Sequence, residues 1–271
     1  MPELPEVEVT KQSLSPMLLG TTISGVHVGK PLRWPLGADP KTLVGQTIVS
    51  VRRRGKYLLF DLDAGLLLLH LGMSGSVSVS QQWPGPLGPH DHFELQTTTC
   101  WMRLNDPRRF GAAVFAPSEN SPQAHKLLGH LGVEPLEAGF TSDYFAAGLA
   151  KRAGAIKQVL LSGDVVVGVG NIYASEALFM AGIRPTRGAK RIGRVRINKL
   201  HQAIQTVLVR AIALGGSSLR DFKHTNGEHG LFQANSQVYG REGQACTQCR
   251  APIKRIVQGQ RATYFCATCQ R

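Results

Sequence analysis

The chain has 271 residues, and its 31 Lys and Arg against 18 Asp and Glu give a formal net charge of +13. A chain of this length buries roughly 70–75% of its extended surface on folding, which excludes a bare binding peptide and allows about two domains. Hydrophobic residues make up 42% and charged residues 18%, a balance typical of globular chains. The basic excess indicates a polyanionic partner, although a basic protein without one fits the charge alone equally well.

Neither a membrane span nor an export signal is visible. The longest apolar run, residues 65–69, is far shorter than the roughly 20 residues of a spanning helix. Residues 1–6 lack the basic start and apolar stretch of a signal peptide. We therefore expect a cytoplasmic protein, in a reducing compartment where disulfides are rare. The five cysteines need another explanation.

In chain order, a helix comes first and a series of strands follows. Residues 5–19 predict an amphipathic helix, with Pro5 suited to its first position and Gly20 to its stop. Short apolar or alternating runs separated by Gly, Pro and Asp then predict eight strands, at Thr22–Val28, Thr47–Arg53, Tyr57–Asp61, Leu66–His70, Val77–Ser80, Phe93–Thr97, Trp101–Leu104 and Ala112–Phe115. Strands at this spacing indicate a sandwich or barrel.

After about residue 120 the hydrophobic period becomes helical. Helices are predicted at Pro122–Leu131, Ser142–Ala153, Ala155–Ser162, Asn171–Ala181 and Arg194–Leu214. Gly215 and Gly216 end the last helix, and a polar loop and a small cysteine-rich module, residues 238–271, follow.

That module carries the strongest chemical signal of the chain. Two pairs of cysteines, each separated by two residues, lie sixteen residues apart, at Cys246, Cys249, Cys266 and Cys269. This spacing brings four thiolates around one Zn²⁺, and a pair of disulfides is the alternative. With all four positions filled by cysteine, no site remains for a catalytic water, so one structural zinc is expected.

A glycine motif, Gly168–Tyr173, lies between two predicted helices. A dinucleotide fingerprint needs a third glycine where Tyr173 stands, so no nucleotide cofactor is expected. Asn171 suits the cap of a helix N-terminus, where backbone N–H groups can hold a phosphate. A plain helix–helix turn is the more common explanation of such an isolated motif.

The N-terminus offers a nucleophile. Removal of Met1 would expose the secondary amine of Pro2, and an α-amine has a much lower pKa than a lysine. A free amine can form a Schiff base with a sugar carbon, and Glu3 or Glu6 can serve as general acid. The alternative is an acidic helix start without chemistry.

Two further features have simpler interpretations. His90-Asp91-His92 has no third ligand at an obvious spacing, so surface polar contacts are favoured over a metal site. Cys100, in a strand-like run, is expected to be a small buried apolar residue.

Together the motifs resemble the formamidopyrimidine-DNA glycosylases, the bacterial 8-oxoguanine DNA glycosylase/AP lyases. The matching stretches run through the chain in family order, at Pro2–Glu8, Arg54–Tyr57, His70–Gly75, His90–His92, Asp106–Gly111, Gly168–Ala174, Val238–Arg241 and the four-cysteine module with Arg261. No single stretch is decisive, but their conjunction is highly specific.

The resemblance implies a role for each catalytic candidate. Pro2 would attack C1′ of the damaged nucleotide, and Glu3 would protonate the deoxyribose ring oxygen. Glu6 matches the second carboxylate of the site. Lys56 matches a lysine that contacts phosphate and takes part in catalysis, and Arg261 matches the zinc-hairpin arginine that assists δ-elimination.

It also implies the DNA contacts. His90, Arg108, Arg152 and Asn171 fall where the family contacts DNA, although position 152 is commonly lysine there. Met73, Arg108 and Phe110 would fill the gap left by the extruded base, and the loop 217–234 would close over that base.

The expected fold is therefore α+β. An N-terminal catalytic β-sandwich domain with an N-terminal helix (1–118) leads through a linker (119–135) to a helical helix–two-turn–helix domain (136–225) and a four-cysteine zinc β-hairpin (238–271). The expected protein is a monomer that binds damaged double-stranded DNA, excises oxidised purines and nicks the strand by β,δ-elimination.

Two other functions stay open. An endonuclease VIII-like glycosylase for oxidised pyrimidines generally starts Pro-Glu-Gly-Pro-Glu, whereas Leu4 stands here in place of the glycine. A non-catalytic zinc DNA-binding protein would bind DNA with the same salt dependence but would not cut it.

Overall fold

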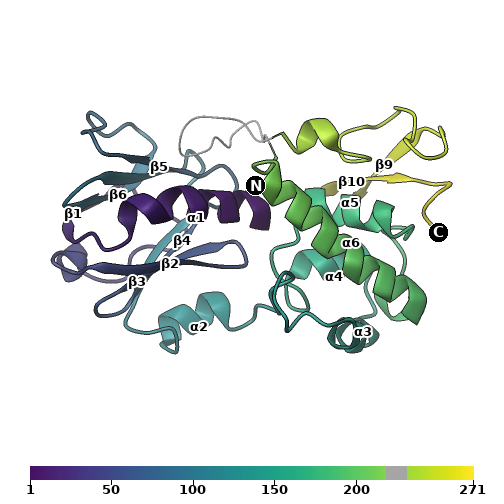
Figure 1. Ribbon diagram of the computed structural model, residues 1–271, viewed down its shortest axis with the longest axis horizontal. Helices are drawn as coiled ribbons and strands as arrows, with labels where there is room; N and C mark the ends of the chain where they lie inside the picture. The colour runs from purple at the N-terminus through teal and green to yellow at the C-terminus, as the bar shows by residue number, and fades with distance from the viewer. Residues whose placement is uncertain (218–230) are drawn as a thin grey trace. The chain divides into compact units, whose positions relative to one another are not determined.

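The structure is a computed structural model that describes residues 1–217 and 231–271. It has two compact units, the first with residues 1–130 and 215–217 and the second with residues 131–214 and 231–271 (Figure 1). No helix in the described part of the chain combines the length and apolarity that crossing a membrane requires.

The first unit opens with helix α1 (Leu4–Leu18). Glu3 and Glu6 form a capping box at its start, and these reciprocal bonds satisfy N–H groups that have no partner inside a first helical turn. The helix ends before Gly20, whose φ of +76° is a conformation that favours glycine. The predicted stop is confirmed, and Pro16 lies in the last turn without interrupting the helix.

Eight strands of the first unit form two antiparallel four-stranded sheets, with strand orders β1-β6-β7-β5 and β2-β3-β4-β8. The strands are β1 (Ile23–Val28), β2 (Ile48–Arg54), β3 (Tyr57–Leu62), β4 (Leu66–His70), β5 (Ser76–Ser80), β6 (Asp91–Thr97), β7 (Trp101–Asn105) and β8 (Ala112–Ala116). Each predicted run overlaps one of them, and the sheets form a sandwich. The short helices η1 (Pro40–Leu43) and α2 (Pro122–Leu128) also belong to this unit.

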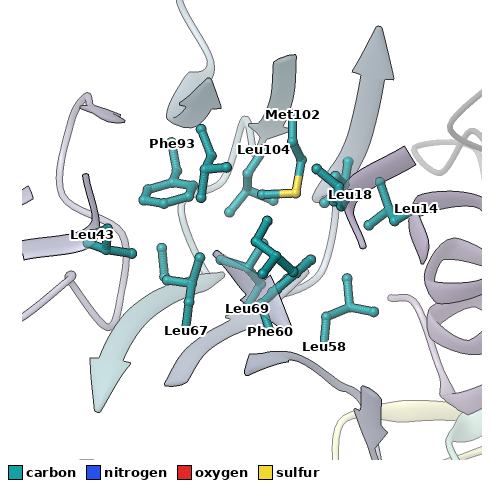
Figure 2. Close-up of a cluster of buried hydrophobic side chains, with 14 of the residues drawn as sticks. Leu14, Leu18, Leu43, Leu58, Phe60, Leu67, Leu69, Phe93, Met102 and Leu104 are labelled. Carbon is teal, nitrogen blue, oxygen red and sulfur yellow. The ribbon is translucent and has the colours of Figure 1, made fainter. Parts of the chain in front are cut away.

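One hydrophobic core joins the two sheets and α1 (Figure 2). It includes Leu14 and Leu18 of α1, Leu43 of η1, Leu58 and Phe60 of β3, Leu67 and Leu69 of β4, Phe93 of β6, and Met102 and Leu104 of β7. Each fully buried side chain of this size stabilises the fold by about 1.5–3 kcal/mol relative to its exposure to water. The core therefore gives a rigid support to the turns at the strand ends, where the candidate residues lie.

The second unit is helical, as predicted. Its elements are α3 (Ser142–Ala150), α4 (Ile156–Ser162), α5 (Asn171–Met180), η2 (Ala189–Arg191), α6 (Arg194–Ala213) and η3 (Gln233–Asn235). Along α6 the buried positions recur every third or fourth residue, at Ile197, Leu200, Ala203, Ile204, Val207, Leu208 and Ala211, so one face packs inward. Gly215 and Gly216 follow with φ of +73° and +79°, which confirms the predicted end of the helix.

A β-hairpin completes the second unit. Strands β9 (Ile253–Gln258) and β10 (Arg261–Cys266) pair antiparallel, and the turn residues Gly259 and Gln260 both have positive φ, as a two-residue hairpin turn requires. Phe179 of α5 packs against Ile253 at the base of the hairpin. The predicted α+β class, with a sandwich, a helical part and a four-cysteine hairpin, is confirmed.

Candidate active site and metal centre

The start of α1 brings the predicted nucleophile and both predicted carboxylates together. Pro2 is buried, and Glu3 and Glu6 are 2% and 0% exposed. Glu6 Oε2 accepts the N–H of Glu3 at 2.8 Å, and Glu6 Oε1 accepts the N–H and the hydroxyl of Ser217 at 2.7 and 2.8 Å. Both oxygens of Glu6 are therefore engaged in holding the helix start, whereas Glu3 is the carboxylate nearer to Pro2 in the chain.

Lys56 lies in the tight turn between β2 and β3. Gly55 supplies the positive φ of +59° that this turn needs. Arg53 Nη1 donates to Gly55 O at 3.0 Å, and Arg53 Nε donates to Glu8 Oε2 on α1 at 2.8 Å. The ion pair of Arg53 with Glu8 ties the turn that carries Lys56 to the helix whose start holds the nucleophile.

His70, at the end of β4, is uncharged near neutral pH. Burial, followed by the positive charges of Lys56 and Arg33, lowers the pKa of His70 from 6.5 to about 4. Its ring packs on the Tyr57 ring, with centroids 4.7 Å apart, and its Nδ1 accepts the N–H of Gly72 at 3.0 Å. An accepting Nδ1 leaves the ring proton on Nε2. The imidazole therefore adds no charge beside Lys56 and fixes the start of the loop after β4.

The three residues predicted to fill the gap in DNA lie on two loops of the first unit. Met73 and Phe110 are 40% and 42% exposed, unusually high values for large apolar side chains next to a packed core. The guanidinium carbon of Arg108 lies 4.8 Å from the centroid of the Phe110 ring. Apolar surface and a cation are thus presented to solvent by the loops on which the sequence predicts them.

The two histidines of the His90-Asp91-His92 stretch differ in their surroundings. His90 is exposed, as a DNA contact requires, whereas His92 is only 3% exposed. The prediction of surface contacts for the whole stretch is therefore wrong for His92, because His90 precedes β6 whereas His92 lies inside it, where the pairing with β7 is irregular between Asp91 and Phe93. Burial lowers the pKa of His92. Cys100 is buried, as predicted, in the turn before β7.

In the second unit, Asn171 is the first residue of α5, and Gly170 is its N-cap without a side-chain bond. The prediction that Asn171 caps the helix is therefore wrong. Its amide bonds to the hairpin instead, where Nδ2 donates to Ala262 O at 3.0 Å, and its Oδ1 accepts from Lys157 Nζ at 2.6 Å. Lys157 Nζ also donates to Thr263 Oγ1 at 2.6 Å and to Ala262 O at 3.2 Å.

Lys157 is thus a fully buried lysine that joins three parts of the second unit. It extends from α4, reaches the start of α5 through Asn171, and reaches β10 through Ala262 and Thr263. Buried ammonium groups persist only where hydrogen bonds replace their lost hydration. The candidate phosphate contact Asn171 is therefore fixed to the strand that begins with Arg261.

The two remaining cationic candidates are placed differently. Arg261 is exposed at the first position of β10. Arg152 is half-buried, and its Nη2 pairs with Asp164, so part of its charge is already neutralised inside the second unit.

A second charged side chain, Glu176 of α5, is also buried and is only 4% exposed. Its carboxylate accepts the backbone N–H groups of Gln237, Val238 and Tyr239, at 2.8, 3.0 and 2.8 Å. Three donors on one carboxylate hold the segment that leads into the hairpin against α5. The Tyr239 hydroxyl lies 3.5 Å from Asn171 Nδ2, so this segment joins the same network.

The four cysteines form the predicted metal centre. Their Sγ atoms all lie within 4.8 Å of one another, with 3.9 Å between those of Cys246 and Cys269 and 3.4 Å between those of Cys249 and Cys266. A tetrahedral Zn²⁺ with Zn–S bonds of about 2.3 Å places its sulfurs about 3.8 Å apart, so the donor set fits one zinc. The site is closed by four thiolates, and the zinc is structural.

The loop predicted to close over the extruded base begins at Ser217, but residues 218–230 lie outside the described residues. Only its first residue, held by Glu6, and its end from Leu231 onward belong to the structure.

Comparison with known proteins covers the whole chain. Three family models match, the formamidopyrimidine-DNA glycosylase N-terminal domain over residues 1–113, its H2TH domain over residues 131–223, and the zinc finger found in FPG and IleRS over residues 243–271. Together with the geometry above, these matches define the class as a DNA glycosylase with a helix–two-turn–helix domain and a zinc finger.

Individual relatives agree. A formamidopyrimidine-DNA glycosylase from Albidiferax ferrireducens is 60% identical over 271 residues, all of both chains. The crystal structure of MutM (Fpg) from Thermus thermophilus superposes with a TM-score of 0.91 at 39% identity, over 99% of this chain and 98% of that one. A Lactococcus lactis FPG variant solved with Fapy-dG-containing DNA gives a TM-score of 0.90 at 33% identity, over 100% of both chains. The chain belongs to the formamidopyrimidine-DNA glycosylase family.

Sequence reasoning missed the residues that hold the candidates in place, among them Lys157, Glu176 and Asp106. Lys157 and Glu176 stand at helix positions whose neighbours three or four residues away are apolar, so their charge on a buried face was the available signal. Asp106 precedes Pro107 and a tight turn, where a carboxylate commonly accepts backbone N–H groups.

Proposed function

We propose that this chain is a bifunctional DNA glycosylase/AP lyase of base excision repair, which excises oxidised purines from duplex DNA and then nicks the strand. Family membership over the full chain and the closed zinc centre carry this conclusion. The assignment of roles to individual residues rests on their match to the family motifs and on the local geometry described above.

Base removal begins at α1. With Met1 removed, the secondary amine of Pro2 attacks C1′, the bond from C1′ to the base breaks, and the amine proton leaves with the base. Glu3 then protonates the ring oxygen O4′, the C1′–O4′ bond breaks, and the iminium of Pro2 forms. The buried position of Glu3 and the fixed helix start support this pairing of roles. Glu6, with both oxygens engaged, positions the helix start and does not exchange a proton.

Strand cleavage follows from the iminium that Pro2 forms. The iminium acidifies the C2′ proton, whose loss expels the 3′ phosphate, and a second elimination expels the 5′ phosphate. Lys56 on its tight turn and Arg261 at the start of β10 are the cations proposed to hold these phosphates. Asn171, fixed by Lys157, and the exposed His90 are further proposed backbone contacts.

The target base must leave the helix, because its glycosidic bond is inaccessible in the duplex. Met73 and Phe110 are proposed to replace its stacking, and Arg108 to bond the orphaned partner base. Their exposure in the first unit supports this role. Arg152 is proposed to contact phosphate through the part of its guanidinium that Asp164 leaves unpaired.

The domain plan proposed for this function has a catalytic sandwich (1–118), a linker (119–135), a helix–two-turn–helix domain (136–225) and a zinc hairpin (238–271). The relatives compared are bacterial proteins, and we propose that the enzyme acts on the bacterial nucleoid in the cytoplasm. The net charge of +13 supports binding to DNA.

Borohydride trapping tests the mechanism. An 8-oxoguanine:cytosine duplex should give a covalent adduct with the wild type, and the adduct should be lost in Pro2→Gly or after chemical blocking of the N-terminus. An unchanged adduct in both cases would overturn the nucleophile. Comparing excision of 8-oxoguanine with that of thymine glycol separates purine from pyrimidine specificity, and binding without any nick would leave a non-catalytic DNA-binding protein.

A further inference from the structure

Two loops of the first unit meet where Met73 and Phe110 are exposed. One loop joins β4 to β5 and the other joins β7 to β8. Their backbones approach so closely that a Cβ on Gly72 would lie 2.6 Å from the backbone of Phe110 and Gly111, and a Cβ on Gly111 would lie 2.6 Å from His70 O. Only glycine permits this approach, so the two loops form one body, called the wedge below and defined as residues 72–75 and 106–111.

Asp106 lies inside the wedge and is fully buried. Its Oδ1 accepts the Ser74 hydroxyl at 3.1 Å and the N–H of Arg108 at 3.3 Å, and its Oδ2 accepts the N–H of Gly111 at 2.7 Å. One carboxylate therefore bonds to the residue after Met73 in the first loop and to the residues on both sides of Arg109-Phe110 in the second.

The second loop needs such support. Arg109 has a φ of +56°, a left-handed conformation that is unfavourable for a residue with a side chain. The Arg109 N–H donates to Asp106 O at 3.0 Å, so the backbone of Asp106 and its side chain both hold the turn. Hydrogen bonds to a buried charged group are the strong ones, and losing them leaves the donors unpaired.

We propose that Asp106 is a positioning residue for base extrusion, which holds Met73, Arg108 and Phe110 as one preformed wedge before DNA is bound. The proposal rests on the proposed function, because the wedge has a role only in an enzyme that extrudes a base. Inserting between base pairs works best with side chains already held in place, since no ordering cost is then added to the cost of unstacking.

The test compares two substrates with one set of variants. The first substrate is a duplex with 8-oxoguanine opposite cytosine, and the second is the same duplex with a preformed abasic site, which needs less extrusion because no base is stacked or paired. Asp106→Asn keeps the size of the side chain but turns one acceptor into a donor. Ser74→Ala removes only the bond to the first loop. Leu43→Ala, in the core at η1, is the control for a general loss of stability.

Asp106→Asn should lower kcat for 8-oxoguanine excision about ten- to a hundred-fold, the loss expected for one or more hydrogen bonds to a charged group. KM and strand cleavage at the abasic site should stay within about three-fold, because phosphate contacts outside the wedge dominate binding. The fluorescence of a 2-aminopurine placed beside the lesion rises when the neighbouring base unstacks. In Asp106→Asn this rise should be slowed by about the same factor as kcat. Ser74→Ala should show the same split at about three- to ten-fold, and the double variant should lose less than the product of the two effects.

A parallel loss on both substrates, as a merely structural role gives and as Leu43→Ala should show, would overturn the proposal, as would excision within two-fold of the wild type. If Asp106→Asn does not fold, Ser74→Ala decides alone by the same criteria. Failure of the wild type to excise 8-oxoguanine would instead refute the proposed function, so the two failures are distinguishable.

Discussion

Replacing Lys157 by methionine should loosen the second unit and weaken DNA binding together. Methionine fills a similar volume but donates no hydrogen bond, so the acceptors on Asn171, Ala262 and Thr263 lose the donor that lies 2.6–3.2 Å away. An unpaired buried acceptor costs about 1–3 kcal/mol. Removing the ammonium also removes the cost of burying a charge, which offsets part of the loss. We expect a net destabilisation of about 2–4 kcal/mol on these magnitudes.

The functional effect should follow from Asn171. Without Lys157 the Asn171 side chain loses the bond on Oδ1 and is held less firmly, although Nδ2 keeps its bond to Ala262 O. One phosphate contact worth about 1.4 kcal/mol corresponds to a ten-fold loss of affinity. The three tryptophans, at positions 34, 83 and 101, all lie in the first unit, so urea unfolding is followed by the circular dichroism signal of the helices. Titration of a duplex with an abasic-site analogue measures the affinity. Thr263→Val, which removes one of the three acceptors, is the matched control and should cost about 1 kcal/mol. Surface substitutions usually change the free energy of unfolding by no more than about 0.5 kcal/mol. A change no larger than this in Lys157→Met, together with unchanged affinity, would refute the reasoning.

Three further outcomes are expected. Between pH about 6.5 and 4, His70 is protonated in the unfolded chain but not in the folded protein, because folding lowers its pKa to about 4. As the pH falls through this window, the free energy of unfolding should therefore fall by about 3 kcal/mol. Urea titrations at pH 7, 5.5 and 4 measure this loss, which should be smaller in His70→Asn. Cys249→Ser should lose zinc and duplex affinity together, measured by metal analysis and gel shift, and full binding by metal-free protein would contradict the role of the hairpin. Glu176→Gln should be about 1–3 kcal/mol less stable than the wild type, since at least one of the three backbone N–H donors then faces the side-chain NH₂ in place of an oxygen acceptor. Equal melting curves would contradict this.

The sequence predicts regular elements well here because their signals are local. The strand alternation and the glycines that end α1 and α6 act within a few residues, and the structure follows them. The cysteine pairs work for the same reason, since metal-ligand spacing is a short-range property. The interpretation of Asn171 as a cap failed because a local preference lost to a contact with Ala262, 91 positions further along the chain.

The candidate site divides in the same way. The motifs identify the side chains proposed to face DNA, whose chemistry is visible in the residue type itself. They do not identify the groups that hold them, because Asp106, Lys157 and Glu176 bond to partners in other segments of the chain, and many of these partners are backbone atoms that any sequence provides. Such partners become visible only when the fold brings separate segments within hydrogen-bond distance.

The burial of the zinc ligands is uneven, and this has a practical consequence at the bench. Cys246 and Cys266 are shielded by protein, whereas Cys249 faces water, and sulfur oxidation follows exposure and thiolate character. Peroxide or a disulfide reagent is therefore expected to react first with Cys249. When the enzyme is assayed on oxidised DNA, its thiol content and its zinc content should be measured together with each rate. A low rate caused by oxidised enzyme is then not mistaken for a poor substrate.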